Sequence, residues 1–292
     1  MWTQRSCGTW MVGLAAMLVG LGGAGCGQRP SGGVETKNGA GDEGPEARGE
    51  RRANNTQLAP YPSPLAPRPF AEATRQDPPA DWQRPPDLTL TGKSVGKLYG
   101  EVVKLWDTIR FTSAQGKTLV YTAILDTELG PLQIALRPDL APNHVRNFVA
   151  LARAGYYDGL VFERTIRAKP DDQPDMEVDV LEGGCPLGTG DEGCGSIGYW
   201  LKPEFSKEPH DVGTVGACHG AEPDSAACKF YIALTKAPLL DGNFTVFGKV
   251  TDGLDVARRI FSQPVRNDPE FPEGDRPEKP VVIRKVTIQV SE

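Results

Sequence analysis

Short apolar runs dominate the chain from residue 118 onward. They are rich in β-branched and aromatic residues and are separated by Gly, Pro, Asp and Asn, which is the pattern of short strands joined by turns. In chain order the runs are TLVYTAILDT, GPLQIAL, LVFERTI, DVLEGG, VGTVGAC, KFYIAL, FTVFGKV and VVIRKVTIQV. We therefore expect about eight short strands in residues 118–292.

Two segments in the same region repeat apolar residues at helical spacing instead. The first begins near Pro142, which suits the first turn of a helix, carries Val145 and Phe148 on one face, and ends at Gly155. The second is GLDVARRIF, residues 253–261. This order of elements predicts a mainly β fold with two capping helices, and we expect a closed eight-stranded β-barrel.

The chain before this domain divides into three parts. Residues 1–25 resemble an export signal, because one Arg is followed by an apolar run and then by small residues. The run is shorter than the ~20 apolar residues that a transmembrane helix needs. Residues 26–91 are rich in Pro and Gly without apolar periodicity, so we expect a disordered tether. Residues 92–117 form an extension that could be a helix, with Leu98 and Val102 on its apolar side, or a strand.

Charge excludes one class of partner. Lys and Arg number 32 against 38 Asp and Glu, for a net charge of -6, and no basic stripe is interleaved with aromatic residues. Binding to nucleic acid normally needs such a basic surface, so we expect no nucleic-acid partner.

Several motifs occur together in an order that resembles the cyclophilin-type peptidyl-prolyl cis-trans isomerases. Between Tyr121 and Val290 these are ILDTELGPLQIAL, APNHVRNFVALARAGYYDGLVFERTI, EGGCPLGTG, GTVGACHGAEPDSAACKFYIAL and PLLDGNFTVFGKVTDGLDVARRI. The resemblance implies a cyclophilin-like barrel, prolyl isomerase activity on proline-containing peptide segments, and no metal or organic cofactor.

The same resemblance implies the site residues. Arg164 stands where the family has its catalytic arginine, whose guanidinium would donate toward the prolyl nitrogen as the peptide bond twists. The matched positions that would hold substrate, most of them around a proline pocket, are Val180, Glu182, His219, Lys229, Tyr231, Leu240 and Phe244.

Other matched positions depart from the family's pattern. The usual residues are replaced at six places, by Glu163 for a His, Glu182 and Lys229 for two Gln, Leu239 for a Trp, Phe244 for a His, and Asp179 for an aromatic. We expect Glu182 and Lys229 to form an ion pair, and Glu182 to draw Arg164 toward itself by a bidentate contact. The departures leave open a second function, that of a catalytically weak or inactive peptide-binding or scaffold lipoprotein.

The cysteines fit an exported chain. Cys26 follows small residues in a segment that resembles a bacterial lipobox, so it is the expected lipid attachment site. Cys185, Cys194, Cys218 and Cys228 could pair in three ways, and we expect the local pairs Cys185–Cys194 and Cys218–Cys228. With no CxxC motif and only three His, a metal site is not expected. We expect a monomer in the bacterial cell envelope, facing the periplasm or the exterior and held to the membrane only by its lipid anchor.

Overall fold

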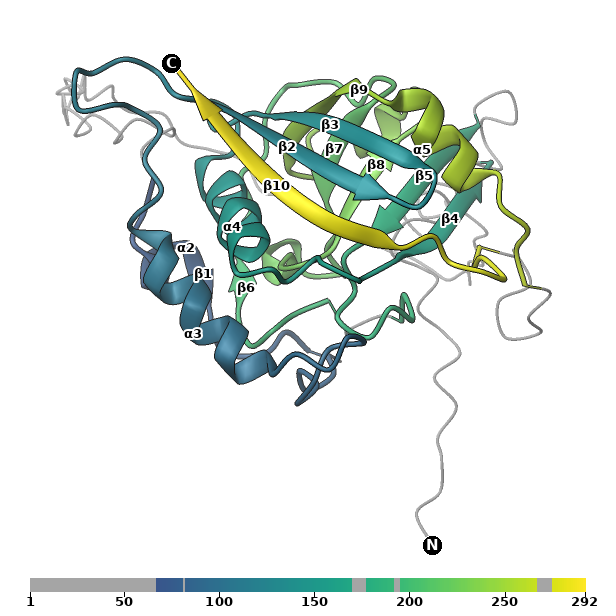
Figure 1. The fold of residues 1–292 in the computed structure, drawn as a ribbon, viewed down its shortest axis with the longest axis horizontal. Coiled ribbons are helices and arrows are strands. Elements are labelled where there is room, and N and C mark those ends of the chain that lie inside the picture. Colours follow the sequence, from purple (N-terminus) through teal and green to yellow (C-terminus); the bar gives the residue numbers. More distant parts are fainter. Residues whose placement is uncertain (1–66, 81, 170–176, 192–194, 267–274) are drawn as a thin grey trace, which may run out of the picture.

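A curled antiparallel sheet of eight strands forms the centre of the molecule (Figure 1). The computed structural model describes residues 67–80, 82–169, 177–191, 195–266 and 275–292. Across the sheet the strands follow the order β10-β2-β3-β9-β7-β8-β5-β4. Their bounds are β2 Val120–Thr127, β3 Gly130–Leu136, β4 Phe162–Ala168, β5 Val178–Gly183, β7 Thr214–Ala217, β8 Phe230–Ala233, β9 Val246–Asp252 and β10 Ile283–Ser291. Each of the eight runs expected from the sequence is thus a strand of this sheet.

The local pattern explains the first hairpin. In β2 the side chains alternate between the buried face and the partly exposed face, as a strand covered on one side requires. The turn to β3 needs Gly130, whose φ of 127° lies in the region that favours glycine. β2 then pairs with β3 from Thr127↔Gly130 to Thr122↔Ala135.

The expectation of a closed barrel is corrected by the two edge strands. β10 and β4 lie at opposite ends of the strand order and share no ladder. Near these edges the described residues show an isolated bridge between Val161 and Val282, with a few backbone hydrogen bonds beside it. The sheet is therefore a curled half-barrel, because only the ends of the edge strands meet.

Both expected helices are present. The helix α4 (Pro142–Arg153) is buried along almost its whole length and packs against β10 and β9. The helix α5 (Leu254–Phe261) packs against β3 and β5 near the other end of the sheet (Figure 1). Two single 3-10 turns, Pro223–Ser225 and Pro238–Leu240, lie in the connections.

Residues 67–80 and 82–119 lie against the domain, and we call them together the N-terminal extension, since they include the extension expected at residues 92–117. The N-terminal extension contains α2 (Phe70–Ala73), β1 (Thr74–Arg75) and α3 (Val95–Trp106), and β1 pairs with the short strand β6 (Trp200–Leu201). Within residues 92–117 the structure shows the helical alternative, over Val95–Trp106. The expected disordered tether is corrected for residues 67–80 and 82–91, which contact the domain, while residues 26–66 lie outside the described residues.

A buried arginine links this extension to α4. Arg146 donates to the carbonyl oxygens of Arg68 and Ile109, at 3.2 and 3.1 Å, and its guanidinium lies 6.0 Å from the Trp106 ring centroid. The Trp106 indole N–H donates to the same Arg68 oxygen at 3.0 Å. These bonds satisfy carbonyls that the irregular backbone of the extension would otherwise bury unpaired.

None of the helices in the described residues has the length and apolar character needed to cross a membrane. The expected signal peptide and Cys26 lie outside the described residues.

Candidate functional site

Three of the predicted residues lie in one row across the outer face of the sheet. Arg164 on β4 is paired with Glu182 on β5, and Glu182 is paired in turn with Tyr231 on β8. Directly opposed residues of neighbouring strands point to the same face. The next position in the row is Gly216 on β7, where a Cβ atom would lie 2.3 Å from the Tyr231 ring. The glycine therefore lets the Tyr231 ring lie flat across β7.

The guanidinium of Arg164 is held by an acid that the sequence did not indicate. Its Nε and Nη2 atoms both donate to Oδ2 of Asp275, the former at 2.8 Å. Asp275 is almost fully buried, and its backbone oxygen accepts from the amide of Thr165 at 2.6 Å. Asp275 is thereby fixed to β4 beside Arg164.

The bidentate contact expected between Glu182 and Arg164 is not formed. Glu182 Oε2 lies 3.8 Å from Arg164 Nη1, too far for a hydrogen bond, whereas Lys229 Nζ donates to Glu182 at 3.0 Å. The expected Glu182–Lys229 ion pair is therefore confirmed, whereas the double contact with Arg164 is made by Asp275 and not by Glu182. Asp275 can make this contact because it lies in a separate loop beside the edge of the guanidinium that carries Nε and Nη2.

Burial and charge together set the protonation of this cluster. Burial works against the charge on Glu182, but Lys229 and Arg164 hold its pKa below the usual value. Burial also disfavours the charged forms of Arg164 and Lys229, yet the neighbouring carboxylates raise the pKa of both. Two cations thus face two anions, Glu182 and Asp275, in a nearly dry setting.

Glu163 adds a buried carboxyl group at the bulge of β4 between Phe162 and Arg164. Burial raises its pKa to about 8, against the opposing charge of Lys229, so the group is mostly protonated at neutral pH. One oxygen accepts from the backbone amide of Cys185 at 3.1 Å. Neutral Glu163 therefore leaves the charge balance of the cluster unchanged.

The four residues predicted for the proline pocket form one apolar cluster. Val180, Tyr231, Leu240 and Phe244 pack together with Val178 and Ala237, and Leu239 lies at its edge. Each of the four predicted side chains is at most 5% exposed. The predicted residues are thus brought together, but they are packed against one another, and a proline ring entering here would have to part them.

Asp179 does not belong to this cluster. It lies between Val178 and Val180 on β5, so its side chain points to the opposite face. The missing aromatic residue at this position therefore leaves the apolar cluster intact.

A hydrogen-bonded chain behind Tyr231 was not expected from the sequence. The Tyr231 hydroxyl lies 2.8 Å from His210 Nε2, and His210 Nδ1 lies 2.8 Å from Asp241 Oδ1. The imidazole is fully buried, and burial lowers the pKa of His210 although Asp241 opposes the shift. This chain fixes the Tyr231 ring in the cluster.

His219 closes the cluster on one side. Its ring stacks on Phe244 with centroids 4.3 Å apart. Its two nitrogens lie 2.7 Å from the Gly220 oxygen and 2.9 Å from the Asn243 oxygen. The stack on Phe244 places His219 at the rim of the apolar cluster.

The disulfide expected between Cys218 and Cys228 is corrected. Both are free thiols, and they belong to opposite faces of the sheet: Cys218 packs at the edge of the apolar cluster with Phe244, whereas Cys228 belongs to the main core. Burial raises the pKa of both thiols. Cys185 is buried, but Cys194 lies outside the described residues, so the Cys185–Cys194 pair stays a prediction.

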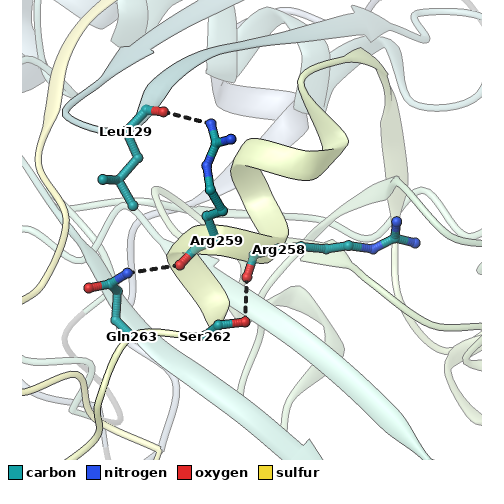
Figure 2. Close-up of a pocket in the computed structure, with 5 residues that line it drawn as sticks. All are labelled: Leu129, Arg258, Arg259, Ser262 and Gln263. Atoms are coloured by element: carbon teal, nitrogen blue, oxygen red, sulfur yellow. Dashed lines mark hydrogen bonds between the residues drawn. The ribbon is translucent and has the colours of Figure 1, made fainter.

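A separate surface pocket lies at the end of α5 (Figure 2). Arg259 donates to the Leu129 oxygen at 2.9 Å, and Gln263 donates to the Arg259 oxygen at 3.0 Å. Figure 2 shows the Arg258 guanidinium pointing away from the other lining residues. None of the predicted site residues lines this pocket. No group of three or more His, Cys, Asp or Glu suited to a metal ion occurs within the described residues.

Comparison with known proteins identifies the family to which this chain belongs. A sequence profile of the family described as cyclophilin type peptidyl-prolyl cis-trans isomerase/CLD matches residues 122–288. A peptidyl-prolyl cis-trans isomerase of Schizosaccharomyces pombe is 36% identical over 162 residues, which cover 55% of this chain and 94% of that protein. Peptidyl-prolyl cis-trans isomerase-like 2 of Cryptococcus neoformans is 37% identical over 172 residues, 57% of this chain and 27% of that protein.

The fold has a counterpart among solved structures. A cyclophilin-type peptidyl-prolyl cis-trans isomerase of Cryptosporidium parvum superimposes with a TM-score of 0.50 at 24% sequence identity, covering 59% of this chain and 99% of that chain. At this identity the likeness speaks for the fold alone, whereas the profile and the sequence relatives carry the family. The chain belongs to the cyclophilin-type peptidyl-prolyl cis-trans isomerases.

Proposed function

We propose that this chain catalyses cis-trans isomerisation of prolyl peptide bonds in exported proteins, and that Arg164 is its catalytic residue. Rotation about a peptide bond costs ~18–20 kcal/mol because the nitrogen lone pair is delocalised into the carbonyl. A guanidinium that donates to this nitrogen in the twisted state stabilises the transition state more than the planar ground state. Prolyl isomerisation is slow enough to limit folding, so such catalysis would assist newly exported chains.

One observation carries this proposal, the shared row and face of Arg164, Glu182 and Tyr231. The row places a guanidinium beside an apolar cluster, since Ile166 and Val180 occupy the neighbouring row and belong to that cluster. A prolyl peptide needs both features, a donor for its nitrogen and an apolar surface for its ring.

A second candidate function is that of a peptide-binding module with little or no catalysis. Two observations favour it. Asp275 occupies Nε and Nη2 of Arg164, and the four pocket side chains are at most 5% exposed. A guanidinium so paired has fewer protons to offer a prolyl nitrogen.

Exchange NMR on a short proline peptide separates the two functions. For the isomerase we expect the wild type to speed exchange between the cis and trans forms, and Arg164→Ala to lose at least about a hundredfold in kcat/KM, the size of effect seen for removal of one transition-state donor. Arg164→Lys keeps the charge without the planar fork and should recover only part of the loss. Exchange at the uncatalysed rate with wild type and Arg164→Ala alike, together with peptide binding by both, would establish the binding module.

The exported, lipid-anchored state is part of the proposal and rests on the sequence before residue 67. In a bacterial host we expect the full chain to sediment with membranes and Cys26→Ser to move to the soluble fraction, because the thiol carries the lipid. Cys7→Ser is the matched control and should leave the distribution unchanged. Retention of Cys26→Ser in the membrane fraction would disprove the anchor.

A further inference from the structure

A segment outside the family region runs along the rim of the site. Residues 74–80 and 82–90, which we call the N-terminal strap, are tied to the domain at both ends. Arg75 forms ion pairs with Glu222 and Asp224 at 2.7 and 2.8 Å. At the far end the amide of Leu90 donates to the Pro186 oxygen at 2.7 Å. The strap therefore bridges the loop after β7 and the loop after β5.

Trp82 lies in the middle of the strap, between two glycines of these loops. A Cβ atom on Gly220 would lie 3.2 Å from the indole Nε1, and a Cβ atom on Gly195 would lie 3.7 Å from Cη2 at the other end of the ring. The ring also packs edge to face on Trp200, with centroids 5.9 Å apart. The indole thus fills the space that the two missing side chains leave.

Both glycines adjoin predicted peptide-binding residues. Gly220 follows His219, whose ring stacks on Phe244. A Cβ atom on Gly195 would lie 3.1 Å from Lys229 Cδ, and the same lysine bonds to Glu182. Trp82 therefore packs against the main core and borders the two glycines that lie next to His219 and Lys229.

We propose that Trp82 is a specificity-determining residue, which closes one end of the peptide groove so that a residue flanking the substrate proline must be small. This inference rests on the proposed function of the site as a place where prolyl peptides bind. The physical reason is exclusion, because a bulky peptide side chain and the indole cannot occupy the same space between Gly195 and Gly220. Trp82 lies outside residues 122–288, so the strap adds this selectivity to a domain shared with the family.

The test uses the folded chain and a set of peptides with one proline. The residues up to two positions on either side of the proline are changed one at a time from Gly to Phe, and kcat/KM is measured by exchange NMR. In the wild type we expect Phe at one flanking position to lower kcat/KM relative to Gly. Trp82→Ala should raise kcat/KM for that Phe peptide about tenfold, the size of discrimination that pocket contacts supply, and leave the Gly peptide unchanged.

Two further variants make the result specific. Trp82→Phe keeps a ring between the loops and should behave nearly as the wild type. Leu88→Ala truncates an exposed side chain on the same strap, 54% exposed and away from the two glycines, and should leave the Phe-to-Gly ratio unchanged. A ratio that is the same in wild type and Trp82→Ala would overturn the proposal.

Affinity for the same peptides, measured by NMR titration, keeps this inference distinct from the proposed function. If the wild type does not catalyse exchange but Trp82→Ala binds the Phe peptide more tightly, the isomerase proposal fails and the role of Trp82 stands. If the wild type catalyses exchange and the Phe-to-Gly ratio does not depend on Trp82, the isomerase proposal stands and the role of Trp82 fails. If neither protein binds any peptide of the set, both proposals fail.

Discussion

Asp275 shows how a single carboxylate can position the reacting group of this site. It receives both hydrogen bonds along one edge of the Arg164 guanidinium, so under the proposed function the remaining N–H groups are those that would face the substrate. Its own backbone is tied to Thr165, the neighbour of Arg164 on β4. A donor held in this way needs little reorganisation when the peptide bond twists, which is the main electrostatic advantage of an enzyme site.

We therefore expect Asp275→Asn to lower kcat for a proline peptide by about tenfold or more with little change in KM, because the variant weakens orientation in the transition state and removes no direct substrate contact. The kcat-to-KM split is measured by exchange NMR at several peptide concentrations. Asp191→Asn is the control, since Asp191 bonds to Arg276 at 2.7 Å in the same region without contacting Arg164. An increase in kcat for Asp275→Asn would mean that Asp275 restrains the guanidinium.

Glu163 should make the free energy of unfolding fall as pH rises, which is the opposite of the effect of a carboxylate held in an ion pair. Burial raises its pKa to about 8 in the folded chain, whereas an unfolded Glu titrates near ~4.3. Between these values the folded state holds a proton that the unfolded state has released. The free energy of unfolding contributed by this group therefore falls as pH rises from about 5 to 8.

Glu163→Gln should remove this contribution, because the amide is neutral at every pH. Urea unfolding at pH 5 and pH 8 measures this contribution. From pH 5 to pH 8 the free energy of unfolding of the wild type should fall further than that of the variant, by on the order of a few kcal/mol. Glu101→Gln, on the exposed side of α3, should behave as the wild type. Equal losses in wild type and Glu163→Gln would show that Glu163 is ionised in the folded chain.

At the scale of elements, α3 attaches the N-terminal extension to the domain by packing against α4. Its buried face contains Val95, Leu98, Val102 and Trp106, and the helix packs against α4. The Ser94 side chain accepts from the Lys97 amide and caps the first turn. Since a helix of this length is marginal alone in water, its packing on α4 supplies most of its stability.

Adjacent valines of α3 test this packing with the same change of side chain. Val102 is fully buried, whereas Val103 is 37% exposed. We expect Val102→Ala to lower the free energy of unfolding by about 2 kcal/mol through lost burial and a residual cavity. Val103→Ala should change it by less than about 0.5 kcal/mol, as is usual at the surface. Equal effects in chemical denaturation would mean that α3 does not pack in solution as described.

At the scale of the whole molecule, a family domain is combined with an N-terminal addition. The family profile covers residues 122–288, and α2, β1 and α3 precede it. The addition contacts the domain in two places, through α3 on α4 and through the strap at the rim of the site. The same segment that leads toward the proposed membrane anchor therefore also borders the proposed peptide groove.

The elements of the domain were predictable from the sequence because their signals are local. Short runs rich in β-branched and aromatic residues between turn residues mark the strands, and a helical repeat after Pro142 marks α4. The site residues Arg164, Glu182 and Tyr231 were predicted from the resemblance of the surrounding motifs to the family, and their common row was seen only in the structure. The Glu182–Lys229 pair was predicted because the resemblance puts these residues in place of two neighbouring glutamines.

Only the tertiary structure decided the contacts between distant segments. Asp275 lies 111 positions from Arg164, and no periodicity links the two. The order of the strap depends on long-range ion pairs of Arg75, so its proline-rich composition alone predicted disorder. Cys218 and Cys228 are close in sequence but point to opposite faces of the sheet. Spacing along the chain determines the elements of this protein, whereas the direction in which each side chain leaves the folded backbone decides which partners it meets.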